Sequence, residues 1–150
     1  MSRVQLALNV SDLDAAVDFY SKLFATPPAK RRPGYANFAV EAPPLKLVLI
    51  ENAQVGGTLN HLGVEVETTD DVTAATTRLQ GDGLETASEE NVTCCYAVQD
   101  KVWVRDPDDA PWEIYTVLAD ADRLSPTAGE AEEQGGCCGS GTEPPAAVCC

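Results

Sequence analysis

The residues best suited to chemistry are six cysteines that form three adjacent pairs, Cys94-Cys95, Cys137-Cys138 and Cys149-Cys150. A disulfide framework ties distant segments together, whereas neighbouring cysteines bridge each other only through a strained small ring. In a reducing compartment we expect the pairs to stay as dithiols. Thiolates are soft ligands, so the pairs suit thiophilic ions such as trivalent arsenic, cadmium or zinc. The alternative for Cys94-Cys95 is two small, partly buried apolar residues.

The only histidine, His61, opens a second segment of interest. It begins an alternating apolar run at 61–67, and the same rhythm occurs around Gln5, which aligns with His61. Eighteen residues further on, each copy has a leucine after a basic residue, at Leu23 and Leu79. The chain therefore contains an internal repeat. Taken alone, a single histidine is more often a hydrogen-bonded core or surface residue than a ligand.

Each copy of the repeat predicts a strand, a helix and further strands. The first copy has these elements: a strand at 3–10, a helix that starts at the capping box Ser11 to Asp14 and has Leu13, Ala16, Val17, Tyr20, Leu23 and Phe24 on one face, at best a short irregular strand within 25–33, and strands at 35–40 and 45–51. After a linker at 53–60, the second copy has these: a strand at 61–67, a helix that follows the cap Thr68 to Asp71, has Val72, Ala75 and Leu79 on one face and ends near Gly81 or Gly83, a candidate strand at 84–89, a hairpin of 93–98 and 102–105 around Gln99 to Lys101, and a strand at 112–118.

Length and charge narrow the function classes. A chain of 150 residues suits one domain with a proper core. Its net charge of -14 argues against nucleic acid and against an anionic membrane surface. There is no secretory leader pattern and no apolar run of about 18 residues, so we expect a cytoplasmic protein. Residues 119–150 have few large apolar residues and predict a disordered tail, whose cysteines are either accessory thiol traps or without a task.

Two β-α-β-β-β modules, each opened by a metal-type residue, resemble the vicinal oxygen chelate superfamily of glyoxalases and extradiol dioxygenases. The resemblance implies an α+β fold. In it, modules 3–51 and 60–118 make one domain, residues 1–118, with a cupped mixed sheet around a divalent metal. The ligands in that family sit on the first and last strands of each module.

The family pattern carries over to three ligands in this chain. Gln5 and His61 match the first-strand positions, and Glu113 falls opposite Lys46 on the last strands. Lysine cannot serve as an anionic oxygen ligand, so the implied metal site is Gln5, His61 and Glu113, with positions left for water, dioxygen or substrate. This set resembles the two-His-one-carboxylate arrangement of non-haem iron oxygenases, from which Gln5 departs. Glu51, out of register, is a fallback ligand.

A narrower likeness involves residues 91–104, which look like the corresponding stretch of the cadmium-induced proteins and the organoarsenical carbon-arsenic lyases. Residues 30–38 give a weaker likeness. The resemblance implies an enzyme that uses iron(II) and dioxygen to cleave the carbon-arsenic bond of trivalent organoarsenicals and releases arsenite. Cys94 and Cys95 are then the catalytic thiols that bind arsenic, and Tyr96 is a candidate substrate contact.

Neighbouring residues on a regular strand point to opposite faces, so we expect Cys94-Cys95 in a loop or an irregular strand start. Asn91 and the residues before it predict a mobile loop that carries substrate to the metal. Two other functions stay open. A protein that sequesters cadmium or arsenite without turnover is favoured by Gln5 and the tail cysteines, and a glyoxalase or thiol transferase is opposed by Lys46. The organic group on arsenic and the oligomeric state are left open.

Overall fold

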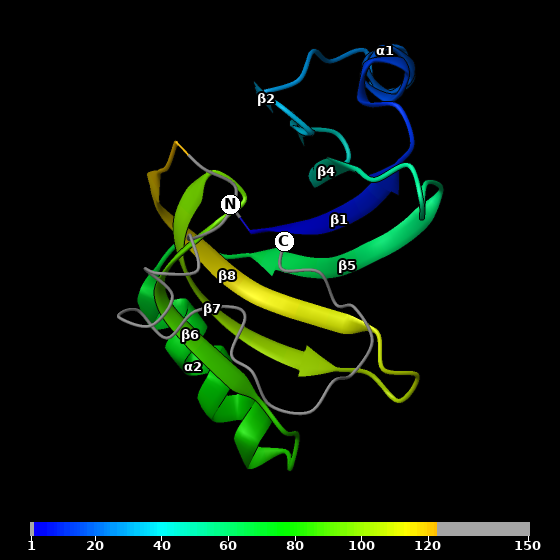
Figure 1. Ribbon diagram of the computed structural model, residues 1–150. Coiled ribbons are helices and arrows are strands. Elements are labelled where there is room, and N and C mark those ends of the chain that lie inside the picture. The colour runs from blue at the N-terminus through cyan, green and yellow to red at the C-terminus, as the bar shows by residue number, and fades with distance from the viewer. Residues whose placement is uncertain (1, 123–150) are drawn as a thin grey trace. The chain divides into compact units, whose positions relative to one another are not determined.

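The computed structural model describes residues 2–122, which form two compact units, Arg3–Leu62 and the part that begins at Gly63 (Figure 1). The elements follow in this order: β1 (Arg3–Val10), α1 (Leu13–Leu23), β2 (Lys30–Arg32), β3 (Tyr35–Val40), β4 (Leu45–Glu51), β5 (Thr58–Glu65), α2 (Thr69–Gly81), β6 (Ala87–Cys94), β7 (Ala97–Arg105) and β8 (Pro111–Asp120). This order confirms the α+β class and the two β-α-β-β-β modules. The predicted tail lies outside the described residues, apart from its first four. Within the described part, no helix is long and apolar enough to cross a membrane.

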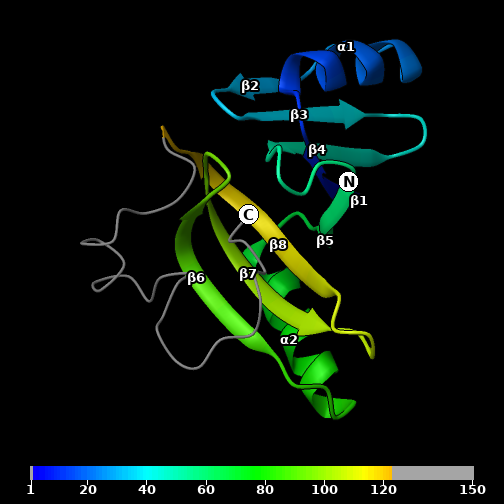
Figure 2. The same ribbon diagram turned by 45° about the vertical axis from the view of Figure 1, so that its right-hand side comes forward.

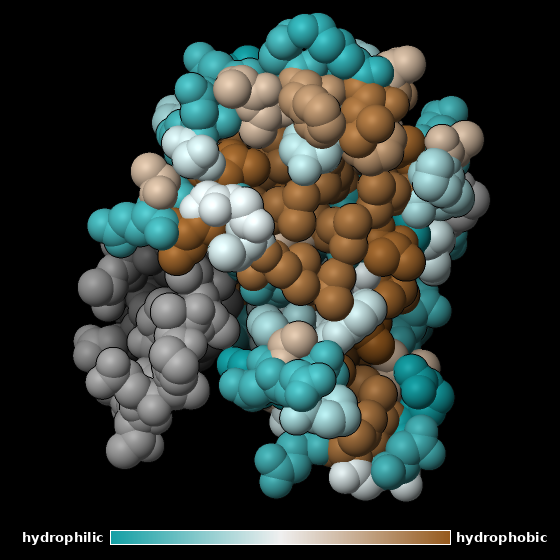
Figure 3. All heavy atoms as spheres, turned by 90° about the vertical axis from the view of Figure 1, so that its right-hand side faces the viewer, coloured by the Kyte–Doolittle hydropathy of each residue, from teal (hydrophilic) through white to brown (hydrophobic). Residues whose placement is uncertain are grey.

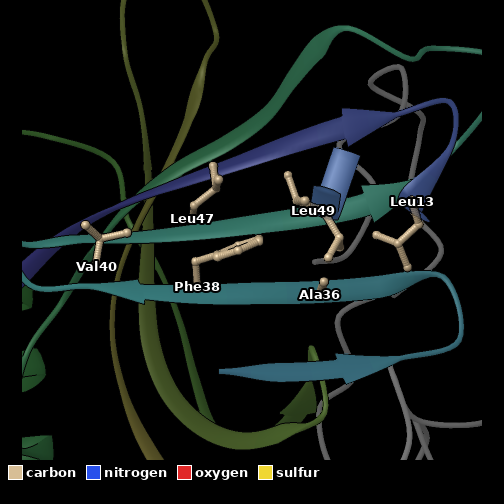
Figure 4. Packing of buried hydrophobic residues seen from close by; sticks show 7 residues of the cluster. Leu13, Ala36, Phe38, Val40, Leu47 and Leu49 are labelled. Carbon is tan, nitrogen blue, oxygen red and sulfur yellow. The ribbon is translucent and has the colours of Figure 1, made fainter. Parts of the chain in front are cut away.

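The first unit is a mixed sheet with one helix against it. Its strands lie in the order β2, β3, β4, β1, with the start of β5 beside β1, and β1 and β4 run parallel. Figure 2 shows β2, β3 and β4 as neighbours, with α1 alongside them. The core between helix and sheet contains Leu13, Val17, Phe38, Leu47 and Leu49 (Figure 4). Because side chains alternate along a strand, Gln5 and Asn9 of β1 face away from this core.

The start of α1 differs from the prediction. Asp12, not Ser11, is the N-cap, and its carboxylate accepts a hydrogen bond from the backbone N–H of Ala15. The next residue, Leu13, donates its backbone N–H to Glu51 Oε1 at 3.0 Å. Both acids neutralise unpaired N–H groups at the positive end of the helix dipole. The capping residue is therefore one position later than expected.

The predicted apolar face of α1 is narrower than expected. Leu13 and Val17 are buried, but Leu23 in the last turn is 58% exposed, and Phe19 is 57% exposed. Figure 3 shows apolar side chains among the residues exposed on the face turned to the viewer. Leu23 has the helical spacing of the apolar face but is exposed, because this spacing gives the direction of a side chain and not how far the sheet extends beneath it.

Strand β5 begins at Thr58, inside the segment predicted as linker. Gly57 allows the turn that leads into β5, because its φ is +83°, and its N–H donates to the Asn9 carbonyl at 2.9 Å. Gly56 is packed so closely that an added Cβ would lie 2.8 Å from the Cβ of Ser11. The two glycines are turn residues, as expected, but the strand resumes directly after them.

The second unit has β8, β7 and β6 as antiparallel neighbours. Helix α2 packs Val72 and Leu79 against Val102 of β7. Its capping box is confirmed, since Thr68 and Asp71 exchange side chain to backbone hydrogen bonds, and the helix ends at Gly81 as predicted.

The hairpin of the second unit turns at a different place from the one predicted. Strands β6 and β7 are joined by Cys95 and Tyr96, with φ of +55° and +59°, and Gln99 to Lys101 lie buried inside β7. Asp100 accepts hydrogen bonds there from Asn91 N at 2.8 Å and from Thr69 Oγ1 at 2.5 Å. Polar residues predicted a turn, but these residues have partners that only the tertiary fold supplies. The predicted loop around Asn91 is likewise part of β6, at an irregularity where Asn91 has φ of +53°.

Candidate functional site

Gln5 and His61 lie together, at matching positions of β1 and β5. Both side chains are buried, and Gln5 Nε2 is 3.0 Å from His61 Nε2. They project from the face of the sheet opposite α1, where the alternation of β1 puts its polar residues. Lys46 is the register partner of Gln5 on β4 and is also buried. The two residues that the in-phase repeat aligns therefore lie side by side.

A polar cluster that the sequence did not reveal surrounds His61. Its Nδ1 lies 2.7 Å from Asn60 Oδ1, and Asn60 Nδ2 donates to Asn9 Oδ1 at 2.9 Å. Asn9 in turn donates from Nδ2 to Thr58 Oγ1 at 2.9 Å. The one available signal was Asn9 at a buried position of an apolar strand, because such a side chain needs hydrogen-bond partners.

Glu113 lies in the second unit, on the sheet face opposite α2. Its carboxylate Oε2 is 2.8 Å from Lys101 Nζ, and the two side chains are 3% and 1% exposed. The ammonium group also lies 5.2 Å from the ring centre of Trp103 and 6.0 Å from that of Tyr115. A carboxylate buried this deeply needs a compensating charge, and Lys101 provides it.

Cys94 and Cys95 occupy the last position of β6 and the first position of the turn. Their sulfur atoms are 3.5 Å apart, and both residues are buried. Because Cys95 leaves the extended backbone, its side chain does not point away from Cys94 as it would on a regular strand. Tyr96 completes the turn and is buried beside the pair.

The strand register puts Cys94 on the same sheet face as Glu113. Val92, two residues before Cys94, pairs with Gln99, and Trp103 pairs with Glu113. Residues two apart on a strand share a face, and so do register partners on neighbouring strands. Counting from Cys94 through Val92, Gln99 and Trp103 therefore puts Cys94 on the same face as Glu113. The thiol pair and the predicted carboxylate ligand thus belong to one surface of the second unit.

Gln99 on this face has a buried side chain whose oxygen Oε1 has no hydrogen-bond partner within residues 2–122. Leaving a buried acceptor unpaired costs about 1–3 kcal/mol. Replacing Gln99 with methionine should therefore raise the free energy of unfolding by about 1 kcal/mol, measured by urea denaturation of the reduced protein. The exposed Gln54→Met is the matched control and should change it by less than about 0.5 kcal/mol. A loss of stability in Gln99→Met would show that the amide is well bonded.

The residue types fit a metal in part. In the first unit His61 offers an imidazole nitrogen and Gln5 an amide, and in the second unit Glu113 offers a buried carboxylate. Each of these is a group that can bind a divalent ion. Within residues 2–122, no three His, Cys, Asp or Glu side chains gather into a metal-binding cluster. The predicted set contains two such residues and an amide.

Comparison with known proteins is consistent with the module order. "Cadmium-induced protein CadI" of Mycobacterium tuberculosis is 63% identical over 122 residues, 81% of this chain and 80% of that protein. "Trivalent organoarsenical cleaving enzyme" of Thermomonospora curvata is 62% identical over 126 residues, 83% of each chain. In fold, the chain is similar to an extradiol ring-cleaving dioxygenase from B. fuscum, with a TM-score of 0.55, 22% identity, and coverage of 81% of this chain and 34% of that one. A family model matches residues 3–114, and the chain therefore belongs to the Glyoxalase/Bleomycin resistance protein/Dioxygenase superfamily.

Proposed function

We propose that the protein cleaves the carbon-arsenic bond of trivalent organoarsenicals in a reaction that needs iron(II) and dioxygen and releases arsenite. The observation that carries this proposal is the Cys94-Cys95 pair, whose sulfur atoms lie 3.5 Å apart at the hairpin turn. A relative that is 62% identical is named a trivalent organoarsenical cleaving enzyme, which supports the cleavage part of the proposal. The reducing cytoplasm, where dithiols persist, is the compartment in which such a pair can work.

The thiol pair accounts for substrate capture. A trivalent arsenical with one organic group has two exchangeable oxygens. The two thiols replace both of them, two As–S bonds form, and two molecules of water leave, while the carbon-arsenic bond stays intact. Arsenic keeps its oxidation state in this step. Cys94 and Cys95 supply the two thiols when both are reduced. Tyr96 is the candidate contact for the organic group.

The metal belongs to a second part of the proposal. Gln5, His61 and Glu113 are the ligands we assign to iron(II), which supplies activation of dioxygen when bound. The imidazole and the amide are brought together by β1 and β5. Lys101 holds the Glu113 carboxylate by its ion pair and keeps it ionised in a buried position. Gln5 and His61 are both buried, which would limit water around an ion that they hold.

The test is anaerobic reconstitution of the reduced protein with iron(II), followed by methylarsonous acid and air. Arsenic species are then separated by chromatography and detected by mass spectrometry. We expect arsenite only when both iron and dioxygen are present. Tight binding of the arsenical without arsenite would instead support sequestration. That second function is favoured by the relatives named cadmium-induced proteins.

Loss of either thiol should remove capture. We expect Cys94→Ser and Cys95→Ser each to lower kcat/KM for methylarsonous acid at least about 100-fold, because the second As–S bond forms within one complex and benefits from a high effective concentration. Steady-state arsenite release at several substrate concentrations measures this.

The control replaces the four tail cysteines, Cys137, Cys138, Cys149 and Cys150, with serine. If they are accessory traps, turnover should be retained. Full activity in Cys94→Ser, or its complete loss in the tail variant, would remove the Cys94-Cys95 pair from the capture step.

A further inference from the structure

The inference starts from a row of hydrogen bonds that leads from the backbone to His61. At its far end, the Thr58 hydroxyl donates to the Val55 carbonyl at 2.6 Å. The Thr58 oxygen accepts from Asn9 Nδ2, and Asn9 Oδ1 accepts from Asn60 Nδ2, both at 2.9 Å. All of these residues belong to the first unit.

The direction of every bond in the row is fixed by its first member. A backbone carbonyl only accepts, so the single hydrogen of the Thr58 hydroxyl is used there. Thr58 must then accept from the amide nitrogen of Asn9, which leaves the Asn9 oxygen facing Asn60. Asn60 has to present its nitrogen to that oxygen, and its own Oδ1 is left for His61. An amide oxygen only accepts, so the Nδ1 atom of His61 must carry the hydrogen.

The hydrogen bond at the other ring nitrogen, Nε2, indicates the same tautomer. Gln5 Nε2 lies 3.0 Å from His61 Nε2, and an amide nitrogen only donates. His61 Nε2 therefore accepts with its lone pair. A Gln5 amide can rotate and present its oxygen instead, whereas Asn60 is held by the row that ends at the Val55 carbonyl. The Asn60 side of the ring thus decides the tautomer.

We propose that Asn60 is a positioning residue that holds neutral His61 in the Nδ1–H tautomer, with Asn9 and Thr58 fixing the direction of the Asn60 amide. The arrangement directs the Nε2 lone pair to the position of Gln5, where a metal ligand must offer it. Histidine in water favours the opposite tautomer, with the hydrogen on Nε2. Contacts within the protein must therefore stabilise the Nδ1–H form. The relevance to iron rests on the proposed function, but the tautomer is a property of the metal-free protein.

His61 is the only histidine, so its ring can be observed without assignment. The experiment uses the full chain, metal-free and reduced, with 15N-labelled histidine in alkaline buffer that keeps the ring neutral. Long-range 1H–15N correlation spectra distinguish a protonated from an unprotonated ring nitrogen. We expect a protonated Nδ1 and an unprotonated Nε2. A protonated Nε2 in the unaltered protein overturns the proposal.

Variants separate positioning from a general structural role. Asn60→Ala should shift the ring towards the Nε2–H form, whereas Asn60→Asp keeps an acceptor for Nδ1–H and should restore the original spectrum. Asn52→Ala, which removes a side chain that accepts a hydrogen bond from the nearby Gln54 N–H, is the matched control and should leave the spectrum unchanged. If Asn60→Ala does not fold, Thr58→Val, which breaks the row at its anchored end, should cause a smaller shift in the same direction. An unchanged tautomer in the folded variants overturns the assignment to Asn60.

Metal affinity provides a second readout. Loss of a hydrogen-bond partner behind a ligating histidine typically costs 10- to 100-fold in affinity, so Asn60→Ala should weaken iron(II) binding by about that factor and Asn60→Asp should recover it. The two proposals fail separately. A protein that forms no arsenite but shows the Nδ1–H ring loses only the proposed function. A protein that forms arsenite with the Nε2–H ring loses only the inference about Asn60.

Discussion

Arsenite release should fall at least about 1,000-fold when His61 is replaced with alanine, which corresponds to about 4 kcal/mol of transition-state stabilisation. A bound metal typically supplies several kcal/mol, and His61 is the one imidazole in the chain that can hold it. The comparison is made between reconstituted proteins at equal concentration, with arsenite quantified after the same exposure to air. Bound iron, measured in parallel by metal analysis, should also be lost.

Glu51→Gln is the matched control for this loss. Glu51 was the fallback ligand, but its Oε1 accepts the Leu13 N–H at the start of α1. A glutamine oxygen can accept the same hydrogen bond, so the fold and the activity should both be retained. Loss of bound iron in Glu51→Gln, with retention in His61→Ala, would mean that the ligand assignment is wrong.

Replacing Lys101 with methionine should lower the free energy of unfolding by about 3–5 kcal/mol. The variant removes the ammonium group that lies 2.8 Å from the buried Glu113 carboxylate, and a methionine cannot replace that ion pair. Urea unfolding of the metal-free, reduced protein measures the effect.

Two further variants decide whether the cause is the uncompensated charge. Lys101→Met combined with Glu113→Leu removes both charges and should recover most of the stability, since an apolar pair often replaces a buried ion pair without loss. Lys22→Met removes an ion pair with Asp18 that is exposed on both sides and should change stability by less than about 1 kcal/mol. A double variant as unstable as Lys101→Met would point to lost packing as the cause.

Much of the fold could be predicted because local signals and the repeat agreed. The cap at Thr68 and Asp71 lies directly before the apolar face of α2, and the in-phase alternation of β1 and β5 placed Gln5 beside His61. The errors occurred where a polar residue has a distant partner. Lys101 was predicted in a turn because it is charged. Its partner Glu113 lies on the neighbouring strand, and the sequence does not show that these two strands are adjacent.

The helix start shows the same difficulty at short range. Ser11 and Asp12 are both good capping residues, and Glu51, 38 positions away from Leu13, contributes to the choice between them. The side chains behind His61 were missed for a related reason. Asn60 and Thr58 were read as linker, since a segment with two glycines predicts a turn and gives no indication of hydrogen bonds to β1.

The turn at Cys95 and Tyr96 has a consequence for engineering. Two successive residues with positive φ favour Asn-Gly or Gly-Gly, since a side chain disfavours this backbone. This chain places a thiol and an aromatic ring there instead. A design procedure that ranks sequences by foldability would choose to replace these two residues first. Thermostabilised versions of the protein should therefore be selected with the proposed arsenical capture as a constraint, because replacing Cys95 removes one of its two thiols.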